Sequence, residues 1–169
     1  KYKPEGYQKF ELRNTIGMDD PWHYRNKAQF QLRKNKRTNQ VEAGLYQADS
    51  HQLVPIKDCL VQEPTTQKVI NTVVNLLTKY DLPIYDERSN SGILRTLMVR
   101  IGVETGEVQL VMITKTPKLP QKNALIREIT NRLPEIVSIM QNIQEKKTSV
   151  IMGDETIHLW GKEVINEKI

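Results

Sequence analysis

The 169-residue chain contains a single cysteine, Cys59, and no apolar run that is long enough to cross a membrane. One cysteine excludes an internal disulfide, and it needs ligands from elsewhere to hold a metal ion. The start of the chain also lacks the charged-then-apolar pattern of a secretion signal. These absences argue against secretion and membrane spanning, and we expect a cytoplasmic protein. Because the chain begins at Lys1 rather than at Met, we also expect that it was cut from something longer or lost a leading segment.

Catalytic patterns are scarce as well. The three histidines, His23, His51 and His158, lie far apart and have no spacing typical of metal ligands. The chain has no glycine-rich turn that opens a predicted helix and no nucleophile elbow. From these residues alone we predict a binding domain rather than a self-sufficient enzyme.

Acidic residues are missing from one stretch, PWHYRNKAQFQLRKNKRTNQV, at positions 21–41. It carries six Lys or Arg residues in a chain whose formal net charge is only +5, so the rest of the chain has a net charge of −1. Such local concentration of positive charge, rather than total charge, is typical of a nucleic-acid surface.

The same stretch alternates with the period of a β-strand. From Tyr24 to Arg33, apolar residues alternate with cations and amides, which predicts a strand with one apolar and one polar face. The polar segment 34–40 then predicts a hairpin loop, with a return strand from Val41. The polar face would carry Arg25, Lys27 and Arg33, interleaved with amide side chains.

Amides can hydrogen-bond bases and sugars as well as phosphates, and Trp22, His23 and Tyr24 are candidate stacking partners for unpaired bases. We therefore predict contact with RNA or DNA. Two alternatives stay open, a solvated face without a partner and a surface that binds an anionic protein.

The remaining pattern predicts an α+β fold, a mainly antiparallel sheet built from hairpins with two or three packed helices. Apolar spacing and prolines predict helices at 7–16, 64–80 and 120–133. Alternation predicts two strands between Ile93 and Thr114 around a turn at Thr105-Gly106, a strand at 136–144, and two short strands flanking Gly153-Asp154. Arg95 falls on the apolar stripe of its strand, so we expect a structural role in which it reaches an acidic partner, a backbone carbonyl or the rim.

Four segments in order resemble a known family: IGMDDPWHYRNKAQF, LVPIKDCLVQEP, SGILRTLMVR and GDETIHLWGKEV. Together they are similar to the central region of the S-adenosylmethionine-dependent RNA uracil-5-methyltransferases, which make 5-methyluridine in ribosomal and transfer RNA. The likeness runs from about residue 16 to residue 164. It implies an RNA-recognition domain at 18–165, after an N-terminal helical segment at 1–17 and before a tail at 166–169.

The resemblance also implies cofactors for the parent protein. Members that act on 23S ribosomal RNA typically hold a four-iron, four-sulfur (4Fe-4S) cluster, and Cys59 matches the fourth of its cysteines. The other three would precede this region, so we expect the chain alone not to assemble the cluster. Because Cys59 fits this branch, we expect ribosomal rather than transfer RNA as the partner. A small buried thiol is the alternative for Cys59.

In the family, the cysteine nucleophile, the general base and the S-adenosylmethionine site belong to a following Rossmann-like domain. We therefore expect this chain to be part of a methyltransferase but inactive by itself. The segment HYRNKAQ resembles the family's RNA-facing strand, which implies RNA-binding roles for Arg25, Asn26, Lys27, Gln29 and Arg33. The competing hypothesis is a non-catalytic module whose basic hairpin docks an acidic protein, and a stand-alone methyltransferase is a distant third.

Overall fold

The computed structural model describes residues 27–46, 53–55, 64–102 and 104–163. In these ranges the chain forms seven strands and two helices: β1 (Lys27–Lys34), β2 (Val41–Tyr46), β3 (Leu53–Pro55), α1 (Pro64–Lys79), β4 (Leu94–Ile101), β5 (Val108–Thr114), α2 (Lys122–Arg132), β6 (Ile136–Ile143) and β7 (Glu155–Gly161). The predicted α+β fold is confirmed. The helix predicted at 7–16 and the proposed domain boundaries lie outside the described residues.

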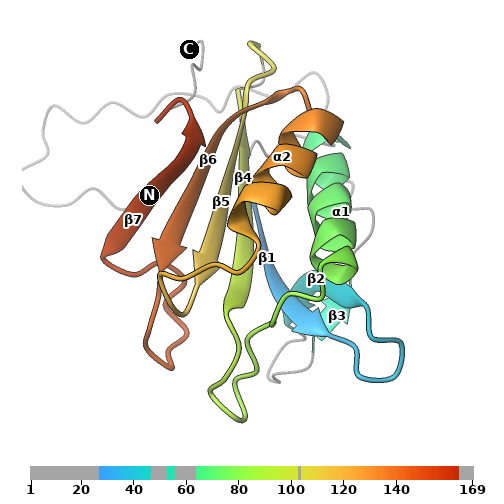
Figure 1. Ribbon diagram of the computed structural model, residues 1–169, viewed down its shortest axis with the longest axis vertical. Coiled ribbons are helices and arrows are strands. Elements are labelled where there is room, and N and C mark those ends of the chain that lie inside the picture. Colours follow the sequence, from blue (N-terminus) through green and yellow to red (C-terminus); the bar gives the residue numbers. More distant parts are fainter. Residues whose placement is uncertain (1–26, 47–52, 56–63, 103, 164–169) are drawn as a thin grey trace, which may run out of the picture.

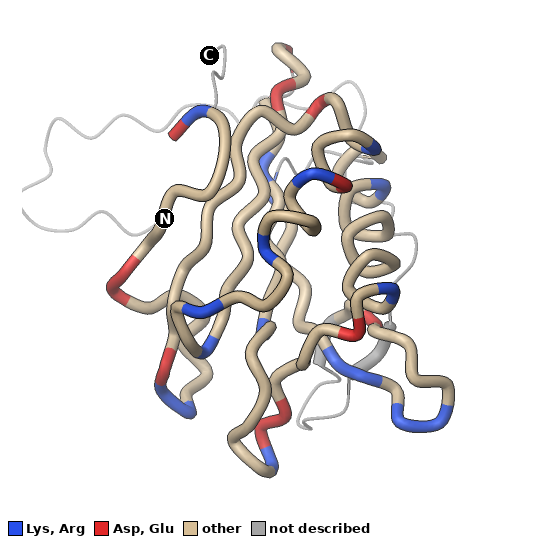
Figure 2. Tube along the Cα trace, in the orientation of Figure 1, with Lys and Arg blue, Asp and Glu red and all other residues tan. Residues whose placement is uncertain are grey.

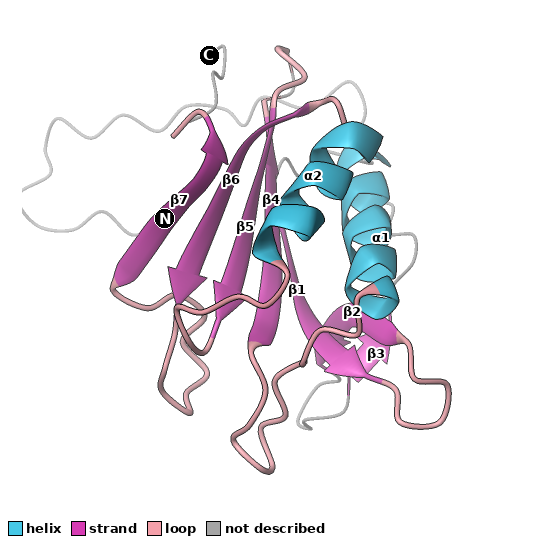
Figure 3. Cartoon of the chain, viewed as in Figure 1, coloured by secondary structure: helices cyan, strands magenta, loops and turns pink. Residues whose placement is uncertain are grey.

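All seven strands belong to one sheet, in the order β3-β2-β1-β4-β5-β6-β7 (Figure 3). Only β5 and β6 run parallel among these neighbours, and α2 lies in the connection between them. A parallel pair needs such a crossover. Neighbours in sequence form the other pairs except β1–β4, which is antiparallel although β2, β3 and α1 lie between its strands in the chain. The basic strand β1 lies between β2 and β4, so it is an interior strand of the sheet.

Both helices pack on the same face of the sheet (Figure 1). The apolar stripe predicted for the first of them is buried in α1 through Val69, Ile70, Val73, Leu76 and Leu77. These side chains meet one apolar face of the sheet, to which β1 contributes Ala28, Phe30 and Leu32. Burying each large apolar side chain contributes roughly 1.5–3 kcal/mol, so this layer is the main source of stability. Neither described helix is long and apolar enough to cross a membrane.

The turn between β4 and β5 confirms the predicted use of glycine. Gly106 has φ of 72°, and its N–H donates to the carbonyl of Gly102 at 2.7 Å. A residue with a side chain would be strained in this left-handed conformation.

The prediction of two strands flanking Gly153-Asp154 is half wrong, because only β7 forms. Side-chain amides bind the backbone of the preceding segment instead. Asn142 binds both the N–H of Gly153, at 2.7 Å, and its carbonyl, at 3.1 Å. Gln144 donates to the carbonyls of Val150 and Met152 at 3.2 and 3.1 Å. These backbone groups are therefore satisfied without a strand partner.

Candidate nucleic-acid interface

The polar face of β1 forms as the alternation predicted. Ala28, Phe30 and Leu32 point into the core beneath the helices. The side chains between them therefore lie on the opposite face of the sheet: Lys27, Gln29, Gln31 and Arg33. Lys27 is exposed, and the other three are half-buried between the neighbouring strands.

Strand pairing adds Arg100 to this face, which the sequence analysis missed. In the antiparallel register between β1 and β4, Lys27 lies directly opposite Arg100, and both side chains are exposed. Like charges on directly opposed residues destabilise a sheet. No ion pair to either cation is found among the described residues. A bound anion would relieve this repulsion, so the pair is suited to binding phosphate.

Further along β1, the same face becomes amide-rich. Gln29 lies opposite Met98, and Gln31 lies opposite Thr96, whose hydroxyl donates to the Gln31 side-chain oxygen at 2.9 Å. This hydrogen bond uses the Gln31 oxygen and fixes the direction of its amide. The Gln31 NH₂ group remains a donor of the kind that binds phosphate or sugar oxygens.

Arg33, one of the residues predicted to bind RNA, is paired within the fold. Its guanidinium lies 2.6 Å from a carboxylate oxygen of Glu42, which is opposite it on β2. The next cation, Lys34, makes a second ion pair at 2.6 Å with Asp81, in the segment after α1. Both charges are therefore compensated locally, which lowers the attraction that they offer to a phosphate.

Arg95 confirms the expected structural role and corrects its placement. The register between β4 and β5 shifts between Leu94 and Thr96, so Arg95 leaves the apolar face. Its guanidinium donates to the carbonyls of Gln144 and Lys146 at 2.7 and 2.8 Å. It also lies 4.1 Å from the ring centre of Tyr85, within the range of a cation–π interaction. Arg95 thereby joins the loops before β4 and after β6.

Several predicted residues fall outside the described part of the chain: Trp22, His23, Tyr24, Arg25, Asn26, His51 and Cys59. Their roles stay predictions. His158, the third histidine, is exposed on β7, and its ring nitrogen lies 2.6 Å from the carbonyl oxygen of Gly161. Among the described residues, no three His, Cys, Asp or Glu side chains are grouped to hold a metal ion.

The chain is similar to several bacterial proteins. It is 68% identical over 169 residues, its whole length, to an uncharacterized RNA methyltransferase of Enterococcus faecalis, of which it covers 37%. A second, from Listeria innocua, is 58% identical over 161 residues, which is 95% of this chain and 35% of the relative. A third, from Lactiplantibacillus plantarum, is 51% identical over 169 residues, again the whole chain and 35% of the relative. The chain therefore spans little more than a third of these relatives. No protein-family model matches it.

Its fold is similar to part of a solved structure, the Pyrococcus abyssi tRNA (uracil-54, C5)-methyltransferase in complex with S-adenosyl-L-homocysteine. The TM-score is 0.67, and the match covers 89% of this chain and 34% of that one. At 22% identity the likeness establishes a shared fold.

Proposed function

We propose that this chain is the RNA-recognition domain of an RNA uracil-5-methyltransferase, and that it binds and orients RNA for a reaction completed elsewhere in the parent protein. The observation that carries the proposal is the exposed pair Lys27 and Arg100, opposed on neighbouring strands beside the amides of Gln29 and Gln31. The names of the relatives and the activity of the Pyrococcus abyssi enzyme support RNA methylation.

In this proposal the strand site, defined as Lys27, Gln29 and Arg100, holds the RNA backbone. Two cations supply charge-assisted hydrogen bonds to phosphate oxygens, and the amide binds an adjacent phosphate or sugar. Arg25 and Asn26, which precede Lys27 in the sequence, would extend the site. Holding the target beside a catalytic domain helps the reaction, because a positioned substrate reacts in an effectively unimolecular step.

S-adenosylmethionine would supply the methyl group in the parent protein, and we propose that this chain alone is inactive. Ribosomal RNA is the proposed substrate, because Cys59 resembles a ligand of the cluster-bearing branch. The described residues offer no set of ligands for that cluster, and no step of the proposed function depends on it.

The test is binding of a labelled ribosomal RNA stem-loop to the 169-residue chain over a series of salt concentrations. The strand variant is Lys27→Ala/Arg100→Ala. The helix control is Lys122→Ala/Arg127→Ala, which removes two exposed cations from α2, in the layer on the other side of the sheet. Each lost phosphate contact lowers the salt slope by roughly 0.7–0.9. If the affinities of variant and wild type are taken as equal at 1 M salt, losing two contacts makes binding roughly 15- to 30-fold weaker at 0.15 M salt.

We expect the strand variant to show this loss and the helix control to bind as the wild type does. Heparin should compete poorly with folded RNA. Equal binding of the strand variant and the helix control would refute the proposal, and heparin competing as well as RNA would favour the acidic-protein alternative. A transfer RNA stem-loop that binds more tightly than the ribosomal one would reassign the substrate.

A further inference from the structure

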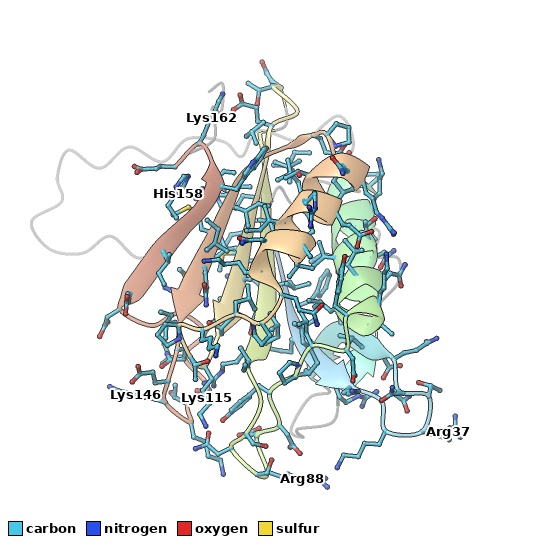
Figure 4. All side chains as sticks on the ribbon, in the orientation of Figure 1. Arg37, Arg88, Lys115, Lys146, His158 and Lys162 are labelled. Atoms are coloured by element: carbon cyan, nitrogen blue, oxygen red, sulfur yellow. The ribbon has the colours of Figure 1, made fainter. Side chains whose placement is uncertain are left out.

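The hairpin tip, defined as residues 35–40 between β1 and β2, stands apart from the rest of the sheet. Figure 2 shows it as a projecting loop with Lys and Arg at its end and no acidic residue along it. Its sequence is NKRTNQ, and residues 36–40 are all exposed. Arg37 extends from the tip away from the body of the molecule (Figure 4). The tip therefore presents two cations, three amides and a hydroxyl.

Hydrogen bonds hold this tip in one shape. The side-chain oxygen of Asn35 accepts from the backbone N–H groups of Arg37 and Thr38 at 2.9 and 3.2 Å. The N–H of Asn39, which has φ of 62°, donates to the carbonyl of Asn35 at 2.7 Å, and Asn35 N–H donates to the carbonyl of Gln40 at 2.8 Å. Asparagine tolerates this left-handed conformation better than most residues. A loop that is already ordered loses less conformational entropy when it binds a partner.

The tip is separated from the strand site by compensated charges. Arg33 and Lys34, which lie between the two, are paired with Glu42 and Asp81. The positive stretch that looked continuous in the sequence thus divides into two groups. From Lys27 to Lys34 the strand advances by seven residues. At about 3.3 Å per residue this is roughly 23 Å, a length that spans several base pairs of an RNA stem.

We infer that the hairpin tip is a second and separate RNA contact, which binds the backbone of a helical stem flanking the segment held at the strand site. Lys36 and Arg37 bind phosphate oxygens, while Thr38 and the amides bind phosphate or ribose 2′-hydroxyl groups. The tip has no aromatic side chain on which an unpaired base could stack, so its groups suit the phosphates and riboses of a paired stem. This inference rests on the proposed function, because the strand site gives the RNA its first anchor.

The experiment compares two RNAs and four main proteins, with a combined strand and tip variant and a charge-conserving exchange as two further checks. One RNA is the single-stranded target loop alone, and the other is the same loop closed by a stem of ten base pairs. The proteins are the wild type, the strand variant, the helix control and a tip variant, Lys36→Ala/Arg37→Ala. The tip variant keeps Asn35 and Asn39, so it keeps the hydrogen bonds that shape the loop. Thermal unfolding of each protein verifies that it is folded.

For the stem-loop, we expect the tip variant to bind roughly 15- to 30-fold more weakly at 0.15 M salt, with a salt slope shallower by roughly 1.4–1.8. For the short strand, it should bind as the helix control does. The strand variant should lose affinity for both RNAs. Because the sites are far apart, the combined variant should lose the sum of the two free energies. The exchange Lys36→Arg/Arg37→Lys should retain the wild-type slope.

Three results would overturn the inference in different ways. A tip variant that binds the stem-loop as the helix control does refutes the second contact, even if the strand variant shows the predicted loss. Equal weakening toward both RNAs would mean long-range attraction rather than contact with a stem. A strand variant that binds both RNAs as tightly as the helix control does would refute the proposed function itself, and the second contact with it.

Discussion

The phenol of Tyr80 donates a hydrogen bond to the carboxylate of Glu128, and this bond joins the end of α1 to α2. Lys79 reaches the other carboxylate oxygen at 2.9 Å, and Arg132 lies 3.4 Å from the same atom. The hydrogen bond from Tyr80, followed by the one from Lys79, lowers the pKa of Glu128 below its usual range. The same carboxylate raises the pKa of Tyr80 above its usual range.

We expect Glu128→Gln to reduce the dependence of stability on pH at both ends of the range. The folded state favours the ionised Glu128, so its contribution is complete above the unfolded pKa of roughly 4.3 and is lost as the pH falls through the lower folded value. The contribution of neutral Tyr80 is present below an unfolded pKa of roughly 10 and is lost as the pH rises through the higher folded value. The measurement is the melting temperature of both proteins from pH 3 to 11.

The difference in melting temperature between wild type and Glu128→Gln should be largest near neutral pH and shrink toward both pH 3 and pH 11. A matched control is Glu145→Gln, which alters an exposed carboxylate in the loop after β6. That control should follow the wild type throughout. Parallel curves for wild type and Glu128→Gln would contradict this account of the Glu128 contacts.

Arg95→Met should destabilise the fold without weakening RNA binding. The variant loses two charge-assisted hydrogen bonds and the contact with Tyr85, which we expect to cost roughly 1–3 kcal/mol in urea denaturation. Arg95→Lys should recover only part of this stability, because an ammonium cannot reproduce the planar fork and the stacking. A salt slope for RNA binding that becomes shallower in Arg95→Met and is restored in Arg95→Lys would argue for direct RNA contact.

The sequence predicted the fold well wherever periodicity was strong. The stripe in α1, the β4–β5 hairpin and the polar face of β1 all rest on apolar spacing over eight or more residues, and all formed. The strand expected just before Gly153 failed because Asn142 and Gln144 supply side-chain hydrogen bonds that no local pattern reveals.

The candidate site was harder to predict because its electrostatics depend on pairing between strands. Arg33 looked the same as Lys27 in the sequence, but the register places Glu42 beside it. Arg100 looked like an isolated surface residue, but the register places it opposite Lys27. One signal could have found Arg100, since its position on β4 alternates with the apolar residues Val99 and Ile101.

Removing one cation of the strand site should stabilise the free protein. The repulsion between Lys27 and Arg100 lowers the free energy of unfolding by roughly 0.2–1 kcal/mol, the range for interactions between directly opposed residues. We expect Arg100→Gln to raise the melting temperature by roughly 1–3 °C at low salt. The gain should vanish in 1 M salt, where charges are screened within roughly 3 Å. Lys122→Gln on α2 is the matched control, and an equal gain there would show a general charge effect instead.

Glu42→Gln should strengthen RNA binding, although it adds no positive residue. Glu42 holds the guanidinium of Arg33 at 2.6 Å, and a neutral amide would remove this negative charge from the face that carries the strand site. One additional phosphate contact corresponds to roughly four- to five-fold tighter binding at 0.15 M salt and a slope steeper by roughly 0.7–0.9.

The matched control for this variant is Glu135→Gln, which removes a carboxylate paired with Lys68 of α1 at 3.5 Å. Both variants raise the net charge by one, so a general electrostatic effect would strengthen RNA binding in both equally. A gain confined to Glu42→Gln would mean that Arg33 binds RNA once its partner is neutral, and that Glu42 limits the affinity of the native surface. No gain in Glu42→Gln would mean that Arg33 makes no RNA contact even when Glu42 is neutral, which leaves the strand site at Lys27 and Arg100 as the contact on the sheet.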